Sequence, residues 1–474
     1  MRIALINPSR FKKMPVGRED RCENTIPNIL PPTGLVYLAT LLLDRGHDVN
    51  LIDANGYDLS LEDVKKILIK NKPDFVVFRA TPETFFEDIK VADVAKSLDG
   101  NLKTAMICWT LSYIPEEVIS KSDNLDYYIT DFYYERPIME LAKNFDPENI
   151  PGVSYKENGE VINNPPSKEA YEFDLLPKPA WDLIPDFNLY WTQVPSTSPW
   201  TFIISMKGCG MNCSFCAITE IKPKFRPEKK VVDEIEYLVN ERNLKYLSFF
   251  DSTFNINRKR LFRMCDEIID RDLNQHFKWF ANVRADIKED EASKMAEAGC
   301  KGVSVGIESG SQKVLDLANK KTTVEQAAET IKNLKKEGIK QYASFIVGLP
   351  GETLETMDQT KRFILKTKPT GFQVNSLVPY SRSKVYDLAV EQGLMEELQF
   401  DNLLLYNSPI SLCELSVDEI NDFRRKIYAD VYKNPGWWMS NIKEVIKNPE
   451  DIYMGLDYTK RVFKRLIRGV NSEN

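Results

Sequence analysis

Short apolar runs alternate with amphipathic stretches over residues 1–145, and this alternation predicts strands and helices in turn. Strands are predicted at Ile3–Ile6, Val49–Ile52, Phe75–Phe78, Thr104–Ile107 and Tyr127–Ile129. Helices are predicted at Gly34–Asp44, Leu61–Lys70, Phe86–Ser97, Pro115–Ser120 and Arg136–Asn144. The pattern indicates a parallel sheet covered by helices, with ligand sites beyond the carboxyl ends of the strands.

A second strand–helix series follows a hairpin and a linker. Residues from Ile150 to Val161 predict the hairpin, turned at Asn158-Gly159, and the Pro- and Trp-rich stretch Pro165–Pro199 predicts an ordered linker with little regular structure. Strands are then predicted at Thr201–Met206, Tyr246–Phe250, Lys278–Asn282, Gly302–Gly306, Tyr342–Val347 and Gly371–Leu377. Six repeats predict a partial α/β barrel whose active site lies where strands end in loops.

The predicted fold class is therefore α/β with four parts. They are a doubly wound, Rossmann-like domain over 1–148, a hairpin and linker over 149–199, a partial (β/α)6 barrel over 200–382, and a helical C-terminal region over 383–474. Within the last part, helices are predicted at Val417–Tyr432 and Asp451–Arg468. The aromatic residues there either help bind a substrate or pack in the core, and core packing is favoured: Tyr406, Tyr428, Tyr432, Trp437 and Trp438.

Composition and charge narrow the class of protein. A chain of 474 residues with 43% hydrophobic and 28% charged residues is ordinary for a globular protein. No apolar run approaches membrane-spanning length, and the start of the chain predicts a strand, so we expect a cytoplasmic protein without a membrane partner. The net charge of −7 disfavours nucleic acid as a partner, and no basic stripe stands out. The basic run Asn319-Lys320-Lys321 is interpreted as a solvated helix end.

Three of the eight cysteines carry the strongest chemical signal. Cys209, Cys213 and Cys216 have the spacing C-x3-C-x2-C on one loop, directly after the apolar run Thr201–Met206. Three thiolates match three corners of a four-iron cluster and leave one iron open for chemistry. The neighbouring Gly208 and Gly210 allow the backbone to fold tightly around a bulky cluster. Eight cysteines in so long a chain do not form a disulfide framework, which indicates a reducing compartment.

Two other metal sites are possible interpretations of the triplet. A zinc knuckle favours paired C-x2-C units with partners downstream, and a ferredoxin loop requires a fourth cysteine elsewhere. The remaining cysteines (Cys22, Cys108, Cys265, Cys300 and Cys413) are scattered singly, and His47 and His276 are the only histidines. The open cluster is therefore the favoured interpretation.

On this triplet the chain resembles the radical S-adenosylmethionine (SAM) superfamily. The resemblance extends to the segments Phe250–Asn255, Gly306–Ser311 and Phe345–Glu352. It implies a [4Fe-4S] cluster that binds SAM and cleaves it with one electron from an external donor, in an anaerobic setting. Ordinary capping and turn formation explain some of the polar residues that follow the predicted strands. The SAM contacts that the resemblance implies are Phe215, Asp251, Asn255, Arg284, Glu308, Ser309, Val347, Gly348 and Tyr380. Arg284 suits the SAM carboxylate, because a guanidinium binds a carboxylate with two hydrogen bonds.

The N-terminal part resembles the cobalamin-binding domain of one branch of that superfamily, on the run Pro31–Ala39 followed by Arg45–Val49. The implied cobalamin contacts are Pro8, Ser9, Gly34, Thr81, Cys108, Trp109, Thr110 and Asp131. The D-x-H-x-x-G motif is missing, so neither histidine is expected to bind cobalt. Relatives have glycine-rich runs at two places where this chain has Cys108-Trp109-Thr110 and Thr130–Glu135. This difference implies either a reshaped pocket or a domain that no longer holds cobalamin.

The resemblance implies a cobalamin-dependent radical SAM C-methyltransferase. One SAM would methylate cobalt to give methylcobalamin, and a second would yield the radical that takes a hydrogen atom from an unactivated carbon. No catalytic residue beyond the cluster and cofactors is expected, since hydrogen-atom abstraction requires no general base. The expected substrate is an amino-acid residue of a peptide or protein, including methyl-coenzyme M reductase, or else a small natural product. Alternatives are an enzyme that cyclises or rearranges a tetrapyrrole or lipid, and a non-catalytic iron–sulfur protein that binds SAM.

Overall fold

The computed structural model describes residues 1–18, 29–167, 173–191, 198–219, 221–395 and 410–447. The chain forms two compact units. The first contains the described parts of 1–210 and 221–250, and the second contains the described parts of 211–220, 251–398 and 404–474. This division follows packing contacts, whereas the sequence boundaries follow the order of elements, so those boundaries stay predictions.

The first unit is built on a sheet of order β2-β1-β3-β4-β5-β6-β7. Strands β1 to β5 run parallel, and β6 and β7 add an antiparallel hairpin. The predicted strands and hairpin are confirmed, and the turn residues Asn158 and Gly159 have the positive φ values (53° and 84°) of a tight hairpin. The strands are β1 (Arg2–Asn7), β2 (Asp48–Asp53), β3 (Phe75–Arg79), β4 (Lys103–Ile107), β5 (Tyr127–Ile129), β6 (Val153–Glu157) and β7 (Glu160–Asn163).

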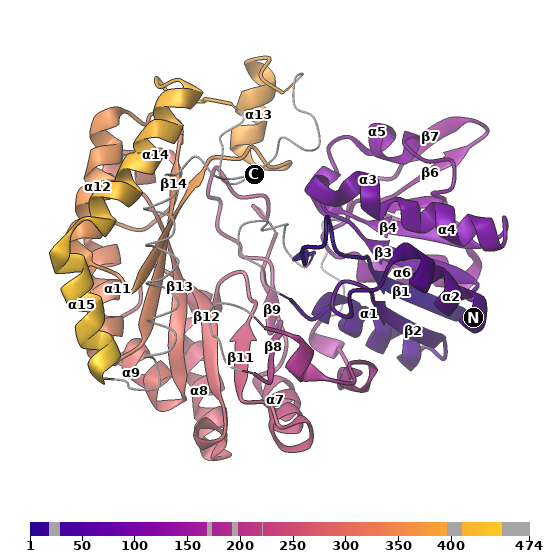
Figure 1. The fold of residues 1–474 in the computed structure, drawn as a ribbon, viewed down its shortest axis with the longest axis horizontal. Helices are drawn as coiled ribbons and strands as arrows, with labels where there is room; N and C mark the ends of the chain where they lie inside the picture. The colour runs from indigo at the N-terminus through magenta and orange to yellow at the C-terminus, as the bar shows by residue number, and fades with distance from the viewer. Residues whose placement is uncertain (19–28, 168–172, 192–197, 220, 396–409, 448–474) are drawn as a thin grey trace. The chain divides into compact units, whose positions relative to one another are not determined.

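Helices cover this sheet (Figure 1). They are α1 (Thr33–Asp44), α2 (Leu61–Asn71), α3 (Phe85–Asp88), α4 (Lys90–Leu98), α5 (Pro115–Ser120) and α6 (Glu135–Asn144). Helix α1 packs against α6, and α2 packs against α4. Because the chain moves from β1 to β2 and then crosses back to β3, right-handed connections place α1 and α2 on opposite faces. The carboxyl ends of β1 and β3 therefore flank the switch point of the strand order, where such sheets bind ligands.

The predicted helix over Phe86–Ser97 is wrong as a single element. The chain forms a 3-10 turn at Pro82–Thr84, then the one-turn α3, and then α4 from Lys90. The break at Ile89 follows Asp88, whose buried carboxylate accepts hydrogen bonds from Arg18 and Thr84. These side-chain contacts hold the short helix in place independently of α4.

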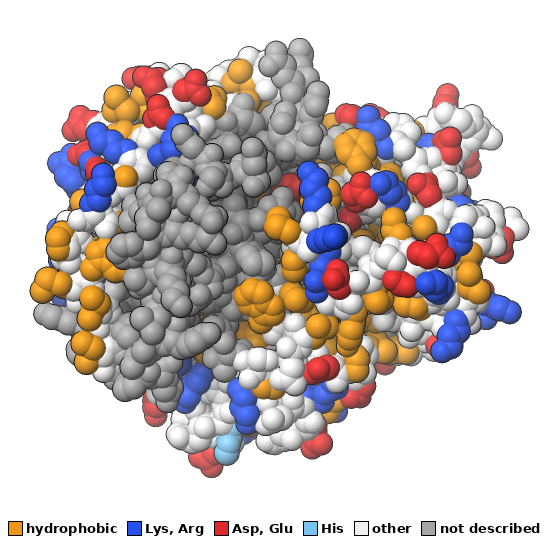
Figure 2. Space-filling view, in the orientation of Figure 1, with side chains coloured by type: hydrophobic (Ala, Val, Ile, Leu, Met, Phe, Trp, Pro, Cys, Tyr) orange, Lys and Arg blue, Asp and Glu red, His pale blue; other side chains and the backbone are white. Residues whose placement is uncertain are grey.

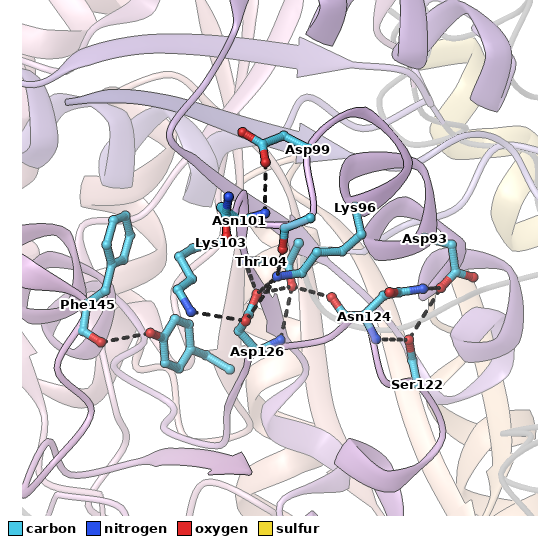
Figure 3. A network of polar contacts seen from close by, with 12 residues as sticks. Asp93, Lys96, Asp99, Asn101, Lys103, Thr104, Ser122, Asn124, Asp126 and Phe145 are labelled. Carbon is cyan, nitrogen blue, oxygen red and sulfur yellow. Dashed lines mark hydrogen bonds and ion pairs between the residues drawn. The ribbon is translucent and has the colours of Figure 1, made fainter. Parts of the chain in front are cut away.

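Figure 3 shows a polar network where β4 and β5 begin. The carboxylate of Asp126 accepts the N–H and hydroxyl of Thr104 at 2.9 and 3.0 Å. It also pairs with Lys96 at 2.8 Å and Lys103 at 3.4 Å. These groups satisfy one another, so the amino edge of the sheet is held by structural contacts. The opposite, carboxyl edge carries the predicted ligand residues.

The first unit also contains the linker and the first repeat of the second series. The linker has 3-10 turns at Phe173–Leu175, Trp181–Leu183 and Phe187–Leu189 among its described residues, which confirms the expected irregular structure. The repeat consists of β8 (Trp200–Ile203), α7 (Glu228–Arg242) and β11 (Tyr246–Phe249), with β8 and β11 parallel. Between β8 and α7, β9 (Met206–Lys207) and β10 (Lys224–Phe225) form an antiparallel ribbon.

The predicted strand Thr201–Met206 is wrong at its carboxyl end, since β8 stops at Ile203. The next residue, Ile204, donates its N–H to the Tyr37 hydroxyl at 3.1 Å. Its carbonyl accepts from Arg226 at 3.3 Å. Side chains far away in the sequence thus occupy the backbone groups that a longer strand would use.

The second unit contains the rest of the strand–helix series. Strands β12 (Lys278–Arg284), β13 (Cys300–Glu308), β14 (Lys340–Val347) and β15 (Gly371–Ser376) run parallel, each paired with the next. The helices after β11 are α8 (Arg258–Asp270), α9 (Glu289–Glu297), α10 (Gln312–Leu317), α11 (Val324–Lys336) and α12 (Leu354–Thr367). Helix α9 packs between α8 and α11, and α11 packs on α12, so the helices form an outer layer (Figure 1). The predicted strands are confirmed.

Helices close the described chain: α13 (Lys384–Glu391), α14 (Val417–Tyr432) and α15 (Pro435–Lys447). The predicted helix Val417–Tyr432 is confirmed, whereas Asp451–Arg468 and Tyr406 lie outside the described residues. The ring of Phe372 on β15 lies 5.1 Å from Tyr428, 5.4 Å from Tyr432 and 6.3 Å from Trp437. Trp438 in turn lies 5.1 Å from Trp437. Core packing is confirmed for Tyr432 and Trp437, which are buried, whereas Tyr428 and Trp438 are half-buried.

Two further observations concern the charges on the surface and the length and polarity of the helices. Acidic and basic side chains are interspersed over the described helices on the face that Figure 2 shows. Within the described residues, every helix is too short or too polar to cross a bilayer.

Candidate active site

The loop of the cysteine triplet turns sharply against the segment that follows it. Gly208 and Gly210 have φ of 77° and 69°, in the left-handed region that favours glycine. A Cβ on Gly208 would lie 2.6 Å from the carbonyl oxygen of Lys222. The N–H groups of Cys209 and Gly210 both donate to the Ile221 carbonyl, at 3.1 and 3.0 Å. Tight backbone folding at both glycines is confirmed.

The rest of the loop is anchored within the second unit. The Ser214 N–H donates to the Ala318 carbonyl at 2.9 Å, and the Ser214 carbonyl accepts from Val385 at 3.0 Å. Phe215 packs on an apolar core of this unit. That core consists of Val314, Ala318, Leu349, Leu377, Val385, Ala389, Ile410 and Leu412. The side chain before the third cysteine is therefore held in place by packing.

The three cysteines lie within eight residues of the sequence. Cys213 is buried, and Cys209 and Cys216 are half-buried. Among the described residues, no three His, Cys, Asp or Glu side chains gather closely enough to hold a single metal ion. A [4Fe-4S] cluster needs a wider arrangement, since each thiolate binds a different iron. The all-thiolate donor set on a tightly folded loop suits such a cluster, and the ligand assignment stays a prediction.

Polar side chains at the carboxyl ends of β12 and β13 form one network. Asn255 accepts the Arg284 N–H at 2.8 Å and donates to Asp286 at 3.0 Å. Arg284 Nε donates to Asp286 at 3.3 Å, and its Nη2 donates to the carbonyls of Lys320 and Lys321 at 3.1 and 3.2 Å. Among the described residues, Nη1 of Arg284 makes no hydrogen bond. The guanidinium is thus fixed in position, with the N–H groups of Nη1 left for a carboxylate.

Glu308 ends β13 in the left-handed conformation, with φ of 71°. Its carboxylate pairs with Lys320 Nζ at 2.7 Å, and the two side chains are only 9% and 8% exposed. A Cβ on Gly306 would lie 2.7 Å from Glu308 Oε1, so the side chain folds back along its own strand. Such backbone strain is typical of functional sites.

The interpretation of Asn319-Lys320-Lys321 as a solvated helix end is wrong for Lys320. Lys321 is exposed, but Lys320 is buried and turns inward to Glu308. A buried carboxylate without a partner is costly, and Lys320 supplies that partner. Its ammonium also lies 5.9 Å from the centre of the Phe215 ring. Lys320 therefore connects two of the predicted SAM contacts.

Ser309 and Asp251 are also fixed by contacts within the second unit. The Ser309 hydroxyl lies 3.3 Å from the Thr360 hydroxyl on α12, and it accepts the Ser311 N–H at 3.2 Å. Asp251 is buried, and its backbone carbonyl accepts from Asn282 at 3.3 Å. Contact of Ser309 and Asp251 with SAM stays a prediction.

Two further predicted SAM residues lie at the ends of the last strands. Val347 ends β14, and its carbonyl accepts the Leu377 N–H at 2.8 Å. Tyr380 follows β15, and its carbonyl accepts the N–H and hydroxyl of Ser383 at 3.1 and 2.6 Å. The structure thus places both at the carboxyl edge, as the strand pattern predicts. Their contact with SAM stays a prediction.

Glu352 closes the turn after β14. Its Oε2 accepts the N–H groups of Gly348 and Leu349 at 2.5 and 3.3 Å. Gly348 has φ of 87°, which explains the glycine at this turn. Burial raises the pKa of the Glu352 carboxyl to about 8, against the opposing effect of the two amide donors. The turn that carries Gly348, a predicted SAM contact, thus depends on one buried acid.

We expect the free energy of unfolding of wild type to depend on pH through Glu352. The Glu352→Gln variant should lack this dependence. Because the folded-state pKa is raised above the ordinary 4.5, this group stabilises the fold fully below pH 4.5 and less as the pH approaches about 8. The wild-type free energy of unfolding should fall relative to that of the variant across this window, by at most about 1.4 kcal/mol per pH unit. Denaturant unfolding at several pH values measures the difference. Glu355→Gln, at an exposed position, is the control, and parallel profiles for wild type and E352Q would contradict the assignment.

In the first unit, a buried ion pair ties together the loops at the switch point. Arg18 donates to Asp88 at 2.7 and 3.0 Å, with both side chains at most 2% exposed. Its Nη1 donates to the Pro8 carbonyl, and Nη2 donates to the Ser9 carbonyl as well as to Asp88, both carbonyls at 2.8 Å. Two of the predicted cobalamin contacts are therefore held rigidly at the end of β1.

The loop after β3 joins the same network. Asp88 accepts the Thr84 hydroxyl at 2.6 Å, and that hydroxyl lies 2.9 Å from the hydroxyl of Thr81. Burial raises the pKa of Asp88, and Arg18 opposes this rise. Thr81 is thus fixed beside the switch point, as the predicted contact requires.

Two buried hydroxyl groups at this edge lack a hydrogen-bond partner among the described residues. They are Ser9 Oγ, which follows β1, and Thr130 Oγ1, which follows β5. Buried polar groups ordinarily have partners. The amide-rich periphery of cobalamin suits such groups. Gly34, also predicted as a contact, lies buried in the first turn of α1.

Large side chains fill the loops after β4 and β5. Cys108 is buried, which raises the pKa of its thiol to about 12 and keeps it neutral. Its sulfur lies 3.5 Å from Thr110 Oγ1, and the Trp109 ring lies 5.3 Å from that of Phe132. Asp131 accepts backbone N–H groups of the loops beside it, from Tyr133 at 2.9 Å and Ser167 at 3.0 Å. Contact of these residues with cobalamin stays a prediction.

Neither histidine lies at a carboxyl edge. His47 directly precedes β2, and His276 precedes β12, so both are at the amino ends of strands. Burial lowers the pKa of His47. The expectation that neither is positioned as a cobalt ligand agrees with this placement.

The residue before the cysteine loop is anchored to the edge of the N-terminal sheet. Lys207 forms a buried ion pair with Glu135, the first residue of α6. The ammonium also lies 4.8 Å from the centre of the Tyr134 ring. The start of the loop that carries Cys209 is therefore fixed to the segment after β5, within the first unit.

A fully buried polar cluster joins α1 and the linker to α7. Glu234 pairs with Arg226 at 2.5 Å, and both side chains are 1% exposed. The Trp181 indole donates to Glu234 at 2.7 Å, and the Tyr37 hydroxyl donates to it at 3.1 Å. Burial raises the pKa of Tyr37, so its hydroxyl stays protonated as a donor. We call these four side chains the Glu234 cluster.

Sequence reasoning missed Arg18, Asp88, Lys320, Lys207 and the Glu234 cluster. Their partners lie far apart in the chain, and no local motif marks them. The one available signal was the charge itself in otherwise apolar surroundings, as at Lys207 beside an apolar strand.

Comparison with known proteins decides the family. Residues 203–364 match the family model of the Radical SAM superfamily. This segment of the chain is a radical SAM domain. An uncharacterized methyltransferase of Pyrococcus horikoshii, PH0819, is 29% identical to it over 447 residues, which is 93% of each chain. The anaerobic magnesium-protoporphyrin IX monomethyl ester cyclase of Rubrivivax gelatinosus is 30% identical over 353 residues, 72% of this chain but 62% of the cyclase.

A solved structure shares the fold of this radical SAM protein. The radical SAM methyltransferase TsrM from Kitasatospora setae, with cobalamin and a [4Fe-4S] cluster bound, superposes with a TM-score of 0.65. The two are 19% identical, and the match covers 82% of this chain and 75% of TsrM. The predicted α/β fold is thereby confirmed.

Proposed function

We propose that this protein is a cobalamin-dependent radical SAM enzyme that methylates an unactivated carbon of an amino-acid residue in a peptide or protein. Methyl-coenzyme M reductase is a candidate substrate, and a small natural product is the second class. The combination of a radical SAM domain with a β2-β1-β3-β4-β5 sheet, ordered at its switch point, carries the proposal. The preference for a protein substrate rests on the absence of a small-ligand motif in the sequence.

When bound, the cluster, SAM and cobalamin supply one-electron bond cleavage and methyl transfer. The chain's own residues position these groups. Arg284, held by Asn255 and Asp286, offers the N–H groups of Nη1 to the SAM carboxylate. The Glu308–Lys320 pair places a neutralised carboxylate at the end of β13. Such positioning is how a protein directs reactive cofactors.

At the other site, the Arg18–Asp88 pair holds the loops that carry Pro8, Ser9 and Thr81. Ser9 and Thr130 offer hydroxyl groups to the polar periphery of cobalamin. Cys108 and Trp109 supply bulk that excludes water from this edge. The neutral Cys108 thiol is a poor metal ligand, because the thiolate is the form that binds metals.

The test is anaerobic incubation with SAM that carries a deuterated methyl group, reductant, cobalamin and candidate peptides, followed by mass spectrometry. We expect a product heavier by one deuterated methyl group, together with both 5′-deoxyadenosine and S-adenosylhomocysteine. Formation of 5′-deoxyadenosine without a methylated product or S-adenosylhomocysteine would contradict methyl transfer. Absence of 5′-deoxyadenosine would instead favour a protein that binds SAM without turnover.

A second candidate function has its own support. The relative from Rubrivivax gelatinosus is named as a cyclase of magnesium-protoporphyrin IX monomethyl ester. A tetrapyrrole substrate is therefore included in the same assay. A new ring without a gained methyl group would favour the cyclase and count against the methyltransferase.

A further inference from the structure

A basic surface lies on the segment that backs the cysteine loop. Of the ten residues Ile221–Lys230, five are Lys or Arg and one is acidic, in a chain with a net charge of −7. Lys222, Lys224, Lys229 and Lys230 are exposed. The expectation that no basic stripe stands out is therefore wrong for this segment. We call these four side chains the lysine surface.

Contacts among the described residues do not explain the lysine surface. Among the described residues, none of its four ammonium groups forms a hydrogen bond or an ion pair. Lys229 and Lys230 lie in the first turn of α7, which begins at Glu228. The helix dipole favours acidic side chains at this end, so two lysines there do not serve helix stability. Their charge is available to a partner.

This surface lies directly behind the first predicted cluster ligand. The Ile221 carbonyl accepts the N–H of Cys209, and the Lys222 carbonyl lies against Gly208 so closely that no Cβ fits between them. Lys224 pairs with Lys207 in the β9–β10 ribbon. The backbone at Lys222 thus lies directly against the loop of Cys209, and Lys229 and Lys230 follow a few residues later in the chain. Electron transfer between proteins requires such an approach.

We propose that the lysine surface is the docking site of an acidic protein that carries single electrons at low potential. The proposal rests on the proposed function, because a radical SAM cluster must be reduced before it cleaves SAM. In this step the carrier loses one electron and the cluster gains it, and no bond or proton is exchanged. Redox encounters bury little surface and depend on charge complementarity for their rate. The four exposed ammonium groups of the lysine surface supply that charge.

The test uses reduced flavodoxin as the probe, with the K222E/K224E and K229E/K230E variants. We expect the second-order rate of cluster reduction, followed by stopped-flow absorbance at low salt, to fall by about tenfold or more in each variant. Flavodoxin affinity, measured on protein without its cluster, should weaken in parallel. For wild type, both quantities should decrease with added salt. The matched control K70E/K72E makes the same charge change at exposed positions by the end of α2 and should behave like wild type.

The outcomes separate the docking surface from the proposed function. Dithionite is a small reductant and needs no docking, so it should reduce the cluster equally in all variants. If flavodoxin reduces wild type and lysine variants at equal rates, the docking proposal is wrong and the proposed function stands. If dithionite yields no 5′-deoxyadenosine from wild type, the proposed function fails, and flavodoxin affinity still tests the surface. Binding of an oligonucleotide to these lysines, without binding of flavodoxin, would overturn the proposal.

Discussion

Replacing Cys213 by alanine is expected to abolish reductive cleavage of SAM. The triplet is already one ligand short of a fully coordinated cluster, so the variant would hold a four-iron cube by two thiolates at most. Loss of a group that only supports a metal ligand lowers metal affinity or activity by about 10- to 100-fold. Loss of a ligand itself should lower them further. We therefore expect 5′-deoxyadenosine formation to fall by more than about 100-fold. Iron content after anaerobic reconstitution should fall with it.

Cys413→Ala is the matched control, because Cys413 is a half-buried thiol outside the triplet. Its iron content and 5′-deoxyadenosine formation should match wild type. A C213A protein that keeps its iron and its activity would remove Cys213 from the ligand set. Wild-type protein that takes up zinc in place of iron would restore the zinc interpretation of the loop.

Replacing Glu234 by alanine is expected to lower the free energy of unfolding by about 3–5 kcal/mol. Glu234 accepts from Trp181 and Tyr37 and neutralises Arg226, and all these groups are buried. The variant would leave a guanidinium without a counter-charge and two donors without an acceptor. Breaking one side of a buried pair costs more than the pair itself contributes, because the desolvation cost of the other side remains.

Denaturant unfolding of the full chain measures this loss. Glu241→Ala, at an exposed position just before the end of the same helix, should change stability by no more than about 0.5 kcal/mol. The double variant Arg226→Met/Glu234→Met removes both charges and should recover much of the loss. If E234A unfolds within about 1 kcal/mol of wild type, the Glu234 cluster is not a stabilising element.

The elements of the fold were largely predictable, since burial on both faces of a parallel strand leaves a continuous apolar run. Phe75–Phe78 is such a run, and every residue in it is buried. The tight backbone turn at Gly208 and Gly210 was predictable as well, because glycine adopts a positive φ more readily than other residues. The spacing of the cysteines likewise identified the superfamily that residues 203–364 match.

The polar pairs were not predictable, because their partners are distant in the sequence. Arg18 meets Asp88 across 70 residues, and Tyr37 meets Glu234 across 197. Local patterns encode neither contact. Lys320 was misinterpreted for the same reason: next to Lys321 it resembles a surface lysine, and only the position of Glu308 at the end of β13 explains its burial. The end of β8 depended on Tyr37 in the same way.

The Glu234 cluster also limits how this protein could be recombined with its relatives. A chimera that exchanged only residues 1–199 would carry a foreign α1 and linker while keeping Arg226 and Glu234 on the other side of the join. Two opposite charges would then face whatever side chains the donor brought in place of Tyr37 and Trp181. A stable chimera has to take all four side chains from the same parent. The suitable junction for exchanging domains therefore lies after β11, and not between the linker and β8.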